Sequence, residues 1–159
     1  MRIYFPTYRN CYVCGEKNKK GLRLKPYFDN GFSCIDIFAD SLYSGAEGSM
    51  HGGIIATLFD EAGYWAAFAE TGKNCVTAEL LIRYKINVKT GIQITSKVKV
   101  IKADSRIVYV EGILVDKDGQ IYSKMKGKYI PMPGNFKDYF KGDEGIQNLD
   151  IEKFRDKLE

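Results

Sequence analysis

The segment that most constrains the fold is the apolar stretch at residues 52–70, GGIIATLFDEAGYWAAFAE. Large apolar residues and alanines cover most of a helical circumference, and only three side chains in the stretch are acidic. A helix that is apolar nearly all round is a buried helix. Thr71-Gly72 then supplies a helix stop signal. One flat sheet face covers too little of such a helix, so a sheet must wrap around it.

Segments with the alternation of β-strands lie on both sides of this helix. Before it, residues 21–28 and 32–39 flank Asp29-Asn30-Gly31, a strong signal for a hairpin turn. After it, four further strands are predicted at residues 75–88, 92–103, 106–115 and 120–130. In the second of these, one face carries Ile92, Ile94, Ser96, Val98 and Val100. The order of the elements predicts an α+β fold, with a long central helix wrapped by an antiparallel sheet.

The length of the chain fits one domain with a sizeable core. We assign residues 1–134 to this domain, with residues 1–20 as an irregular N-terminal segment. Residues 135–159 form a polar C-terminal tail, in which Ile151, Phe154 and Leu158 make a short amphipathic stretch. We expect the tail to be a short peripheral helix or disordered, and to carry no chemistry.

Charge and hydropathy exclude several classes of function. The formal net charge is +4, and lysines alternate with apolar residues instead of gathering in a basic block, so nucleic acid is not an expected partner. No apolar run approaches the ~20 residues of a membrane span, so no membrane partner is expected either. The first residues lack the apolar stretch and the cleavage site of a signal peptide. We therefore expect a cytoplasmic protein.

Four cysteines raise the question of a metal site. Cys11 and Cys14 form one Cys-x-x-Cys pair, whereas a four-ligand zinc site commonly needs two such pairs or added histidines. The chain has a single histidine, His51, far along the sequence. Cys34 and Cys75 lie in predicted strands, where a cysteine behaves as a small buried hydrophobe. We therefore expect a plain turn after Cys14, no metal, no bound cofactor, and no need for Cys11 or Cys14 in catalysis.

The segment richest in chemical groups is Gly48-Ser49-Met50-His51-Gly52-Gly53, which leads into the predicted helix. Adjacent glycines let the backbone approach a ligand closely, and a helix N-terminus offers unpaired N–H groups at the positive end of its dipole. Such groups suit a developing oxyanion, for example on a thioester carbonyl under attack. The spacing equally fits a plain glycine turn at a crowded helix start.

Asp60 and Glu61 lie near the middle of the otherwise apolar helix, where an unpartnered carboxylate is unfavourable. Consecutive helical positions point about 100° apart, so only one of the two is expected to face a given site. Asp60 shares a stripe with Gly53 and Thr57, and we assign the catalytic carboxylate to Asp60. Glu61 is expected to form a structural ion pair with a lysine or an arginine.

Residues 51–62, HGGIIATLFDEA, resemble the signature of hot-dog thioesterases of the phenylacetate-pathway and 4-hydroxybenzoyl-CoA thioesterase type. Residues 76–84, VTAELLIRY, resemble the strand that follows the helix in this family. Residues 11–15, CYVCG, resemble a subgroup with a Cys-x-x-Cys-Gly start. The resemblance spans residues 11–131. It implies a hot-dog fold, hydrolysis of an acyl thioester such as acyl-CoA, and a site between subunits.

The resemblance also implies roles for individual residues. Gly52 matches a glycine whose backbone N–H polarises the thioester carbonyl, and Asp60 matches a carboxylate that acts as nucleophile or as general base on water. Thr77 matches a strand hydroxyl that positions water or the carboxylate, and His51 matches a residue that fixes the loop or contacts the ligand. Two sets of site residues are therefore expected: catalytic Asp60, Gly52 and Thr77, and substrate-binding His51, Gly53, Tyr43 and Glu61.

One position departs from the pattern of the family. Six residues before His51, several members carry an asparagine or glutamine that contacts the thioester or water, whereas this chain has Gly45. Tyr43, Ser44 and Glu47 are candidates to replace that contact. The departure keeps open a non-catalytic acyl-CoA-binding or regulatory hot-dog domain. A hot-dog dehydratase or hydratase is a further alternative, which the two glycines after His51 disfavour.

The spacing of Gly52 and Asp60 adds a geometric constraint. Eight residues of helix separate them by about 12 Å, whereas attack and oxyanion stabilisation converge on one carbonyl carbon. Two copies of the helix packed antiparallel across a twofold axis would bring Gly52 of one to Asp60 of the other. We therefore expect a homo-oligomer, either a dimer or a tetramer. Its small-molecule partner is acyl-CoA, and CoA enters only as part of the substrate.

Overall fold

The structure, a computed structural model, describes residues 1–158. The elements follow in the order β1 (Ile3–Tyr4), β2 (Tyr27–Asp29), β3 (Phe32–Phe38), the 3-10 helix η1 (Ser41–Tyr43), α1 (Gly52–Thr71), β4 (Cys75–Tyr84), β5 (Gln93–Ala103), β6 (Val108–Asp116), β7 (Ile121–Pro131), the 3-10 helix η2 (Phe136–Phe140), α2 (Glu144–Gln147) and α3 (Ile151–Asp156). Within residues 1–158, no helix combines the length and the hydropathy that a membrane span requires.

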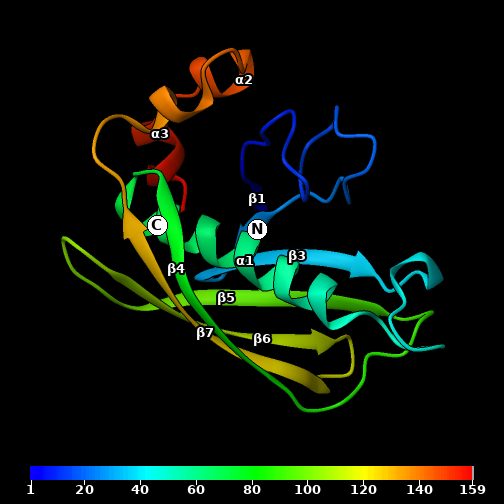
Figure 1. The fold of residues 1–159 in the computed structure, drawn as a ribbon. Coiled ribbons are helices and arrows are strands. Elements are labelled where there is room, and N and C mark those ends of the chain that lie inside the picture. The colour runs from blue at the N-terminus through cyan, green and yellow to red at the C-terminus, as the bar shows by residue number, and fades with distance from the viewer. Residues whose placement is uncertain (159) are drawn as a thin grey trace.

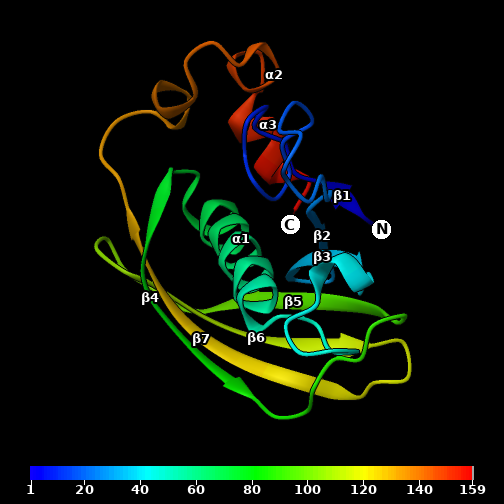
Figure 2. The same ribbon diagram turned by 45° about the vertical axis from the view of Figure 1, so that its right-hand side comes forward.

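One antiparallel sheet contains the seven strands of residues 1–158, in the order β1-β2-β3-β5-β6-β7-β4. The sheet curves around α1, which lies along its concave side (Figures 1 and 2). Strands β3, β4, β5, β6 and β7 all contact the helix. The structure thus confirms the predicted α+β fold, in which an antiparallel sheet wraps a long central helix.

The core between α1 and the sheet follows the predicted alternation. On β5, Ile94, Ser96 and Val98 are fully buried on the side that faces the helix. From the helix, Leu58 and Phe59 are fully buried against them in the same apolar cluster. Each large apolar side chain buried in this way stabilises the fold by about 1.5–3 kcal/mol. The inward row of β5 therefore holds the sheet on the helix.

The N-terminal hairpin is shorter than predicted. Its turn lies where expected, because Asn30 and Gly31 both adopt left-handed backbone angles, with φ of 48° and 80°. Residues 21–26, however, are not part of a strand. They run beside the N-terminal loop instead, where the N–H of Leu22 donates to the carbonyl of Tyr12 at 2.8 Å. A long-range contact has replaced local strand pairing there.

Both ends of the chain pack onto this framework. The N-terminal segment, predicted to be irregular, contributes β1, which pairs with β2. The C-terminal tail, expected to be peripheral, lies near the C-terminal half of α1 (Figure 1). Its apolar side chains pack against Trp65 and Phe68 of this helix. Together they form a second apolar cluster that contains Phe5, Trp65, Phe68, Phe136, Ile146 and Phe154. This cluster explains why the tail is ordered in spite of its polar composition.

The tail also closes the C-terminal end of α1. Helix α1 ends at Gly72, whose φ of 66° is left-handed, as in a typical glycine cap. Arg155 on α3 donates from Nε to the carbonyl of Ala69 at 3.0 Å and from Nη2 to that of Glu70 at 2.6 Å. A cation at the negative end of the helix dipole is stabilising. Arg155 therefore joins the tail to the central helix.

Candidate active site

His51 is the N-cap of α1. Its Nδ1 accepts the N–H of Gly53 at 2.8 Å, and its own backbone N–H donates to the carbonyl of Tyr43 at 2.7 Å. The partly buried side chain of Tyr43 packs against the core, and its backbone carbonyl is the contact with His51. Gly45 lies beside the imidazole, because a Cβ built there would be 3.1 Å from His51 Cδ2. The position that departs from the family pattern therefore faces the capping histidine.

Gly52 presents the first backbone N–H of α1. No atom of residues 1–158 accepts a hydrogen bond from this N–H, whereas the N–H of Gly53 is occupied by His51. Tyr84 at the end of β4 donates from Oη to the carbonyl of Gly52 at 2.9 Å and so fixes the start of the helix. A free N–H at the positive end of a helix dipole is suited to bind an oxyanion.

Asp60 is held by two strands. Thr77 on β4 donates from Oγ1 to Asp60 Oδ1 at 2.7 Å, which brings together two of the predicted catalytic residues. Tyr129 on β7 donates from Oη to the backbone carbonyl of Asp60 at 3.0 Å. Gly63 makes room for Tyr129, since a Cβ at this position would overlap the tyrosine hydroxyl. The carboxylate is thereby oriented, and its second oxygen has no partner among the described residues.

Glu61 has partners other than the predicted ones. Trp65 donates from Nε1 to Glu61 Oε1 at 2.9 Å, and Cys11 Sγ lies 3.6 Å from Oε2. Within the described part of the chain, no lysine or arginine forms an ion pair with Glu61. The predicted ion pair is therefore wrong, because the N-terminal segment covers this face of the helix with thiols instead of cations. Burial of the carboxyl group is the main cause that raises the pKa of Glu61 to about 7, and the negative charge of the nearby Cys11 thiolate is the second.

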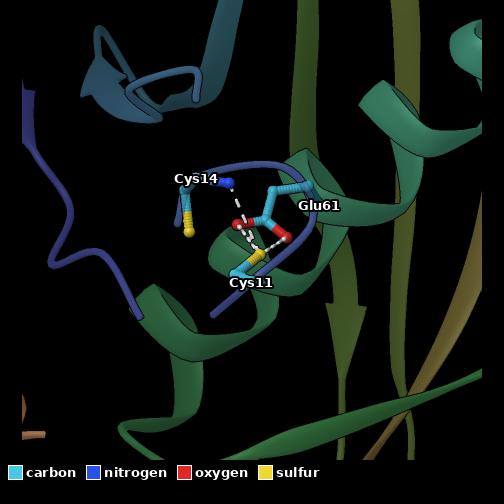
Figure 3. A group of neighbouring side chains, drawn as sticks. All are labelled: Cys11, Cys14 and Glu61. Carbon is cyan, nitrogen blue, oxygen red and sulfur yellow. Dashed lines mark hydrogen bonds between the residues drawn. The ribbon is translucent and has the colours of Figure 1, made fainter. Parts of the chain in front are cut away.

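Cys11 and Cys14 lie over α1 at the level of Glu61 (Figure 3). The side chain of Cys14 and the N–H groups of Cys14 and Val13 lower the pKa of Cys11 to about 6, although burial opposes this shift. The hydrogen bond to Cys11, together with burial, raises the pKa of Cys14. Sequence reasoning missed this cluster, because Cys11 and Glu61 are 50 positions apart and meet only in the folded chain. The other two cysteines, Cys34 and Cys75, are buried as predicted.

A cavity of about 310 Å³ joins these groups. Asp60, Glu61 and Thr77 line it, whereas Gly52, Gly53, His51 and Tyr43 do not. Its wall also contains residues outside the predicted site sets: Tyr8, Cys11, Cys14, Tyr64, Trp65, Asn74 and Phe140. Of these, Cys11 and Cys14 had a signal in the Cys-x-x-Cys pattern. Tyr64 had one because it follows Asp60 by four residues and so shares its helix face.

A larger depression of about 690 Å³ lies on the outer face of the sheet. Its polar lining includes Lys97, Lys99, Glu111, Lys124 and Lys126. Strand alternation places these side chains on the face opposite α1, so neither helix carboxylate faces this depression. The candidate active site is therefore the smaller cavity, where a carboxylate is held by a strand hydroxyl.

Comparisons with known proteins show that the chain is similar to thioesterases. Residues 47–123 match the family model of the thioesterase superfamily. A crystal structure of a thioesterase superfamily protein is similar to this chain at 26% identity and a TM-score of 0.68, over 77% of this chain and 60% of that one. This chain thus spans less than two thirds of that protein. No curated protein matches the chain significantly.

Two further solved structures share the fold at lower identity. The E. coli PaaI protein from the phenylacetic acid degradation operon is 20% identical with a TM-score of 0.62, over 67% of this chain and 77% of that one. The smu.793 protein from Streptococcus mutans UA159, solved with bound acetyl CoA, is 19% identical with a TM-score of 0.63, over 68% and 86%. The predicted hot-dog fold is confirmed. The family match begins at residue 47, so the Cys-x-x-Cys-Gly resemblance remains a prediction.

Proposed function

We propose that the protein hydrolyses an acyl thioester, with acyl-CoA as its substrate, to a free acid and a thiol, because residues 47–123 match the family model of the thioesterase superfamily. The observation that carries this proposal is the Asp60 carboxylate, which lines a cavity and is oriented by Thr77 at 2.7 Å. The S. mutans protein of the same fold binds acetyl CoA, which supports the choice of thiol.

In the proposed reaction, Asp60 supplies the attacking pair of electrons in one of two ways. It removes a proton from water while the water oxygen attacks the thioester carbonyl carbon, or its own oxygen attacks first and water then cleaves the resulting anhydride. Either route consumes one water, breaks the carbon–sulfur bond and delivers a proton to the departing thiolate. The hydrogen bond from Thr77 fixes one carboxylate oxygen and leaves the other for the reaction.

In this proposal the backbone N–H of Gly52 stabilises the oxyanion. It does so in the partner subunit's cavity and not in the cavity of its own chain. Gly52 and Asp60 lie at helix positions about 12 Å apart, and Gly52 does not line the cavity. One thioester carbonyl therefore needs Asp60 from one subunit and the partner subunit's Gly52. Complete sites form only in an oligomer built on a symmetric pair of chains.

Strand β4 offers an edge for such pairing. It is the last strand of the sheet, and β7 is its one strand partner within residues 1–158. Its exposed apolar side chains include Val76, Leu81 and Tyr84, and a long exposed edge of this kind is a template for a second strand. Because Thr77 and Tyr84 contact Asp60 and Gly52 from opposite ends of β4, antiparallel pairing of two β4 edges would bring the required residues together.

The direct test is the release of free thiol from a panel of short, medium and aromatic acyl-CoAs. Asp60→Asn keeps the shape of the side chain but removes its charge and basicity, so we expect turnover to fall by ~10²-fold or more. Binding of acyl-CoA, followed by calorimetry, should change little. Glu70→Gln is the matched control, because it removes an exposed carboxylate from the same helix outside the cavity.

The outcomes separate hydrolysis from binding alone. Hydrolysis that survives Asp60→Asn in a folded oligomer would contradict the assignment of Asp60. Tight binding of acyl-CoA without thiol release by the unmodified protein would favour an acyl-CoA-binding domain. Gly45 gives that second candidate its physical basis, because the position next to the His51 ring lacks a polar side chain.

A further inference from the structure

Two thiols and a carboxylate form a compact cluster at the cavity (Figure 3). One ligand atom from each of Cys11, Cys14 and Glu61 lies within 4.8 Å of the other two. Cys11 Sγ is 3.6 Å from Glu61 Oε2 and 3.8 Å from Oε1. Neither cysteine takes part in the proposed hydrolysis, so the cluster needs a separate explanation.

Backbone hydrogen bonds and close packing fix the conformation of the turn that carries Cys11 and Cys14. The N–H groups of Val13 and Cys14 both point at Cys11 Sγ, at 3.3 and 3.4 Å, as they would toward a thiolate ligand. The N–H of Gly15 donates to the carbonyl of Cys11 at 3.0 Å, and a Cβ at Gly15 would overlap the backbone of Cys11 and Arg9. These backbone contacts thus hold the turn that carries the two thiols.

The Glu61 carboxylate is also held in one orientation. Trp65 donates from Nε1 to Glu61 Oε1 at 2.9 Å and so sets the orientation of the group, as residues behind metal ligands commonly do. In a tetrahedral zinc site with bonds of about 2.0–2.3 Å, neighbouring ligand atoms lie about 3.3–3.8 Å apart. The 3.6 Å between Cys11 Sγ and Glu61 Oε2 already meets this spacing.

We infer that Cys11, Cys14 and Glu61 form a binding site for one thiophilic divalent cation, of which Zn²⁺ fits best. Thiolate and carboxylate ligands are both typical of zinc, whereas magnesium and calcium avoid sulfur. From the sequence we expected no metal, because the chain has one Cys-x-x-Cys pair and no histidine near it. The fold supplies the third ligand from the middle of α1.

Three protein ligands leave a fourth position in a tetrahedral site, and such a position is typical of zinc sites that bind water or substrate. Here the three ligands line the same cavity as Asp60, Asn74 and Thr77. The fourth position is therefore shared with the cavity. The ion also links the N-terminal segment to α1 across the 50 positions that separate Cys11 from Glu61. The inference is independent of the proposed hydrolysis.

The test uses the fully reduced full-length protein, because a Cys11–Cys14 disulfide would remove two ligands. Metal-free protein is titrated with Co²⁺, whose thiolate charge-transfer band reports sulfur ligation, and Zn²⁺ is then added as competitor. We expect one ion per chain, a thiolate band that Zn²⁺ abolishes, and a rise in thermal stability with Zn²⁺. Cys14→Ser and Glu61→Gln should each weaken binding by more than about tenfold.

Cys34→Ser is the matched control, since Cys34 is a buried cysteine outside the cluster, and it should bind like the unmodified protein. Circular dichroism shows whether each variant is folded. Absence of a thiolate band in reduced, folded protein would overturn the inference, as would a Cys14→Ser variant with unchanged affinity. Loss of the band in Cys14→Ser with no change in Glu61→Gln would remove Glu61 from the site and contradict the three-ligand assignment.

Discussion

Gly52 and Gly53 are neighbours in the sequence, yet the structure gives their amides different tasks. The N–H of Gly53 donates to the histidine cap at 2.8 Å, whereas the N–H of Gly52 has no acceptor within residues 1–158 and is the oxyanion donor that we propose. The sequence alone does not show which of the two glycines donates to His51, because that depends on where the helix begins and how the histidine side chain is oriented. The distinction leads to a test at a single atom.

Gly52→Pro replaces the hydrogen of this N–H with a ring carbon. Proline is favoured at the first helical position, and the residue before it, His51, already has the extended angles that proline requires, with ψ of 132°. We expect folded protein whose turnover falls ~10²–10³-fold, the usual effect of losing one oxyanion donor. Thiol release from acyl-CoA measures it.

Gly52→Ala is the matched control for that substitution. Its Cβ would lie 3.4 Å from the Tyr84 ring, an ordinary contact, and the N–H remains. Near-normal turnover is therefore expected. Equal activity of the proline and alanine variants would show that this N–H does not contact the reacting carbonyl.

Gly63 has a different role, which is steric. In an exposed helix interior, replacing glycine by alanine stabilises by about 1 kcal/mol. At Gly63 the added methyl would overlap the fully buried Tyr129, so we expect Gly63→Ala to destabilise the protein by about 1–3 kcal/mol instead. Urea unfolding measures the difference, and a gain in stability would contradict the packing described here. Because Tyr129 bonds to the carbonyl of Asp60, turnover should fall as well.

Residue-level prediction from sequence worked where a local pattern carried the information. The contact of Thr77 with Asp60 was expected from the family motif, and the structure places them 2.7 Å apart. The partner of Glu61 was predicted wrongly, because nothing local to α1 indicates that the turn at Cys11 folds over it. The partners of side chains that meet distant segments of the chain are therefore the part of the site that could not be predicted from the sequence.

At the scale of elements, the central helix depends on a segment far away in the sequence. Arg155→Ala removes two hydrogen bonds to the last carbonyls of α1 and a cation from the negative end of its dipole. We expect a loss of about 1–2 kcal/mol in the free energy of unfolding, given partial exposure to solvent. Lys153→Ala in the same short helix is the control, since its ion pair with Asp150 is exposed and contributes little. Indistinguishable unfolding curves would contradict the bridging role.

The elements themselves were largely predictable. Strands β5, β6 and β7 lie close to where alternation indicated, because each presents one face to the core and one to solvent. Strand β4 ends at Tyr84, four residues before the predicted end of its strand at Val88, and most of its side chains are exposed. β1 was missed, since two residues carry no periodicity and the strand exists only through its pairing with β2. The order in the tail was missed because Phe136 and Ile146 are isolated apolar residues in a polar stretch. Both residues are buried only because they pack against apolar side chains of other segments, such as Phe5 and Trp65.

At the scale of the whole molecule, the proposed sites can be tested by mixing defective chains. Asp60→Asn and Gly52→Pro homodimers each lack one half of every site. A mixed dimer has one site with both halves intact, so co-expression should restore about a quarter of the unmodified activity when pairing is random. Thiol release by the co-purified mixture, compared with each variant alone, measures the recovery.

Recovery also requires that the protein be at least a dimer, which sedimentation at micromolar concentration can establish. A mixture no more active than its parts, although mixed dimers are present, would contradict a site shared between chains. An active monomer would contradict it independently.

Part of the cavity wall comes from outside the segment that matches the family. Tyr8 and Phe140, one from each end of the chain, meet edge to face with ring centroids 5.3 Å apart, and both line the cavity that holds Asp60. Insertions or deletions near either terminus would reshape this wall while leaving α1 and β4 untouched. Over evolutionary time, the range of acyl groups accepted in the proposed reaction can therefore diverge in the segments that flank residues 47–123, while the proposed hydrolytic chemistry is inherited unchanged between them.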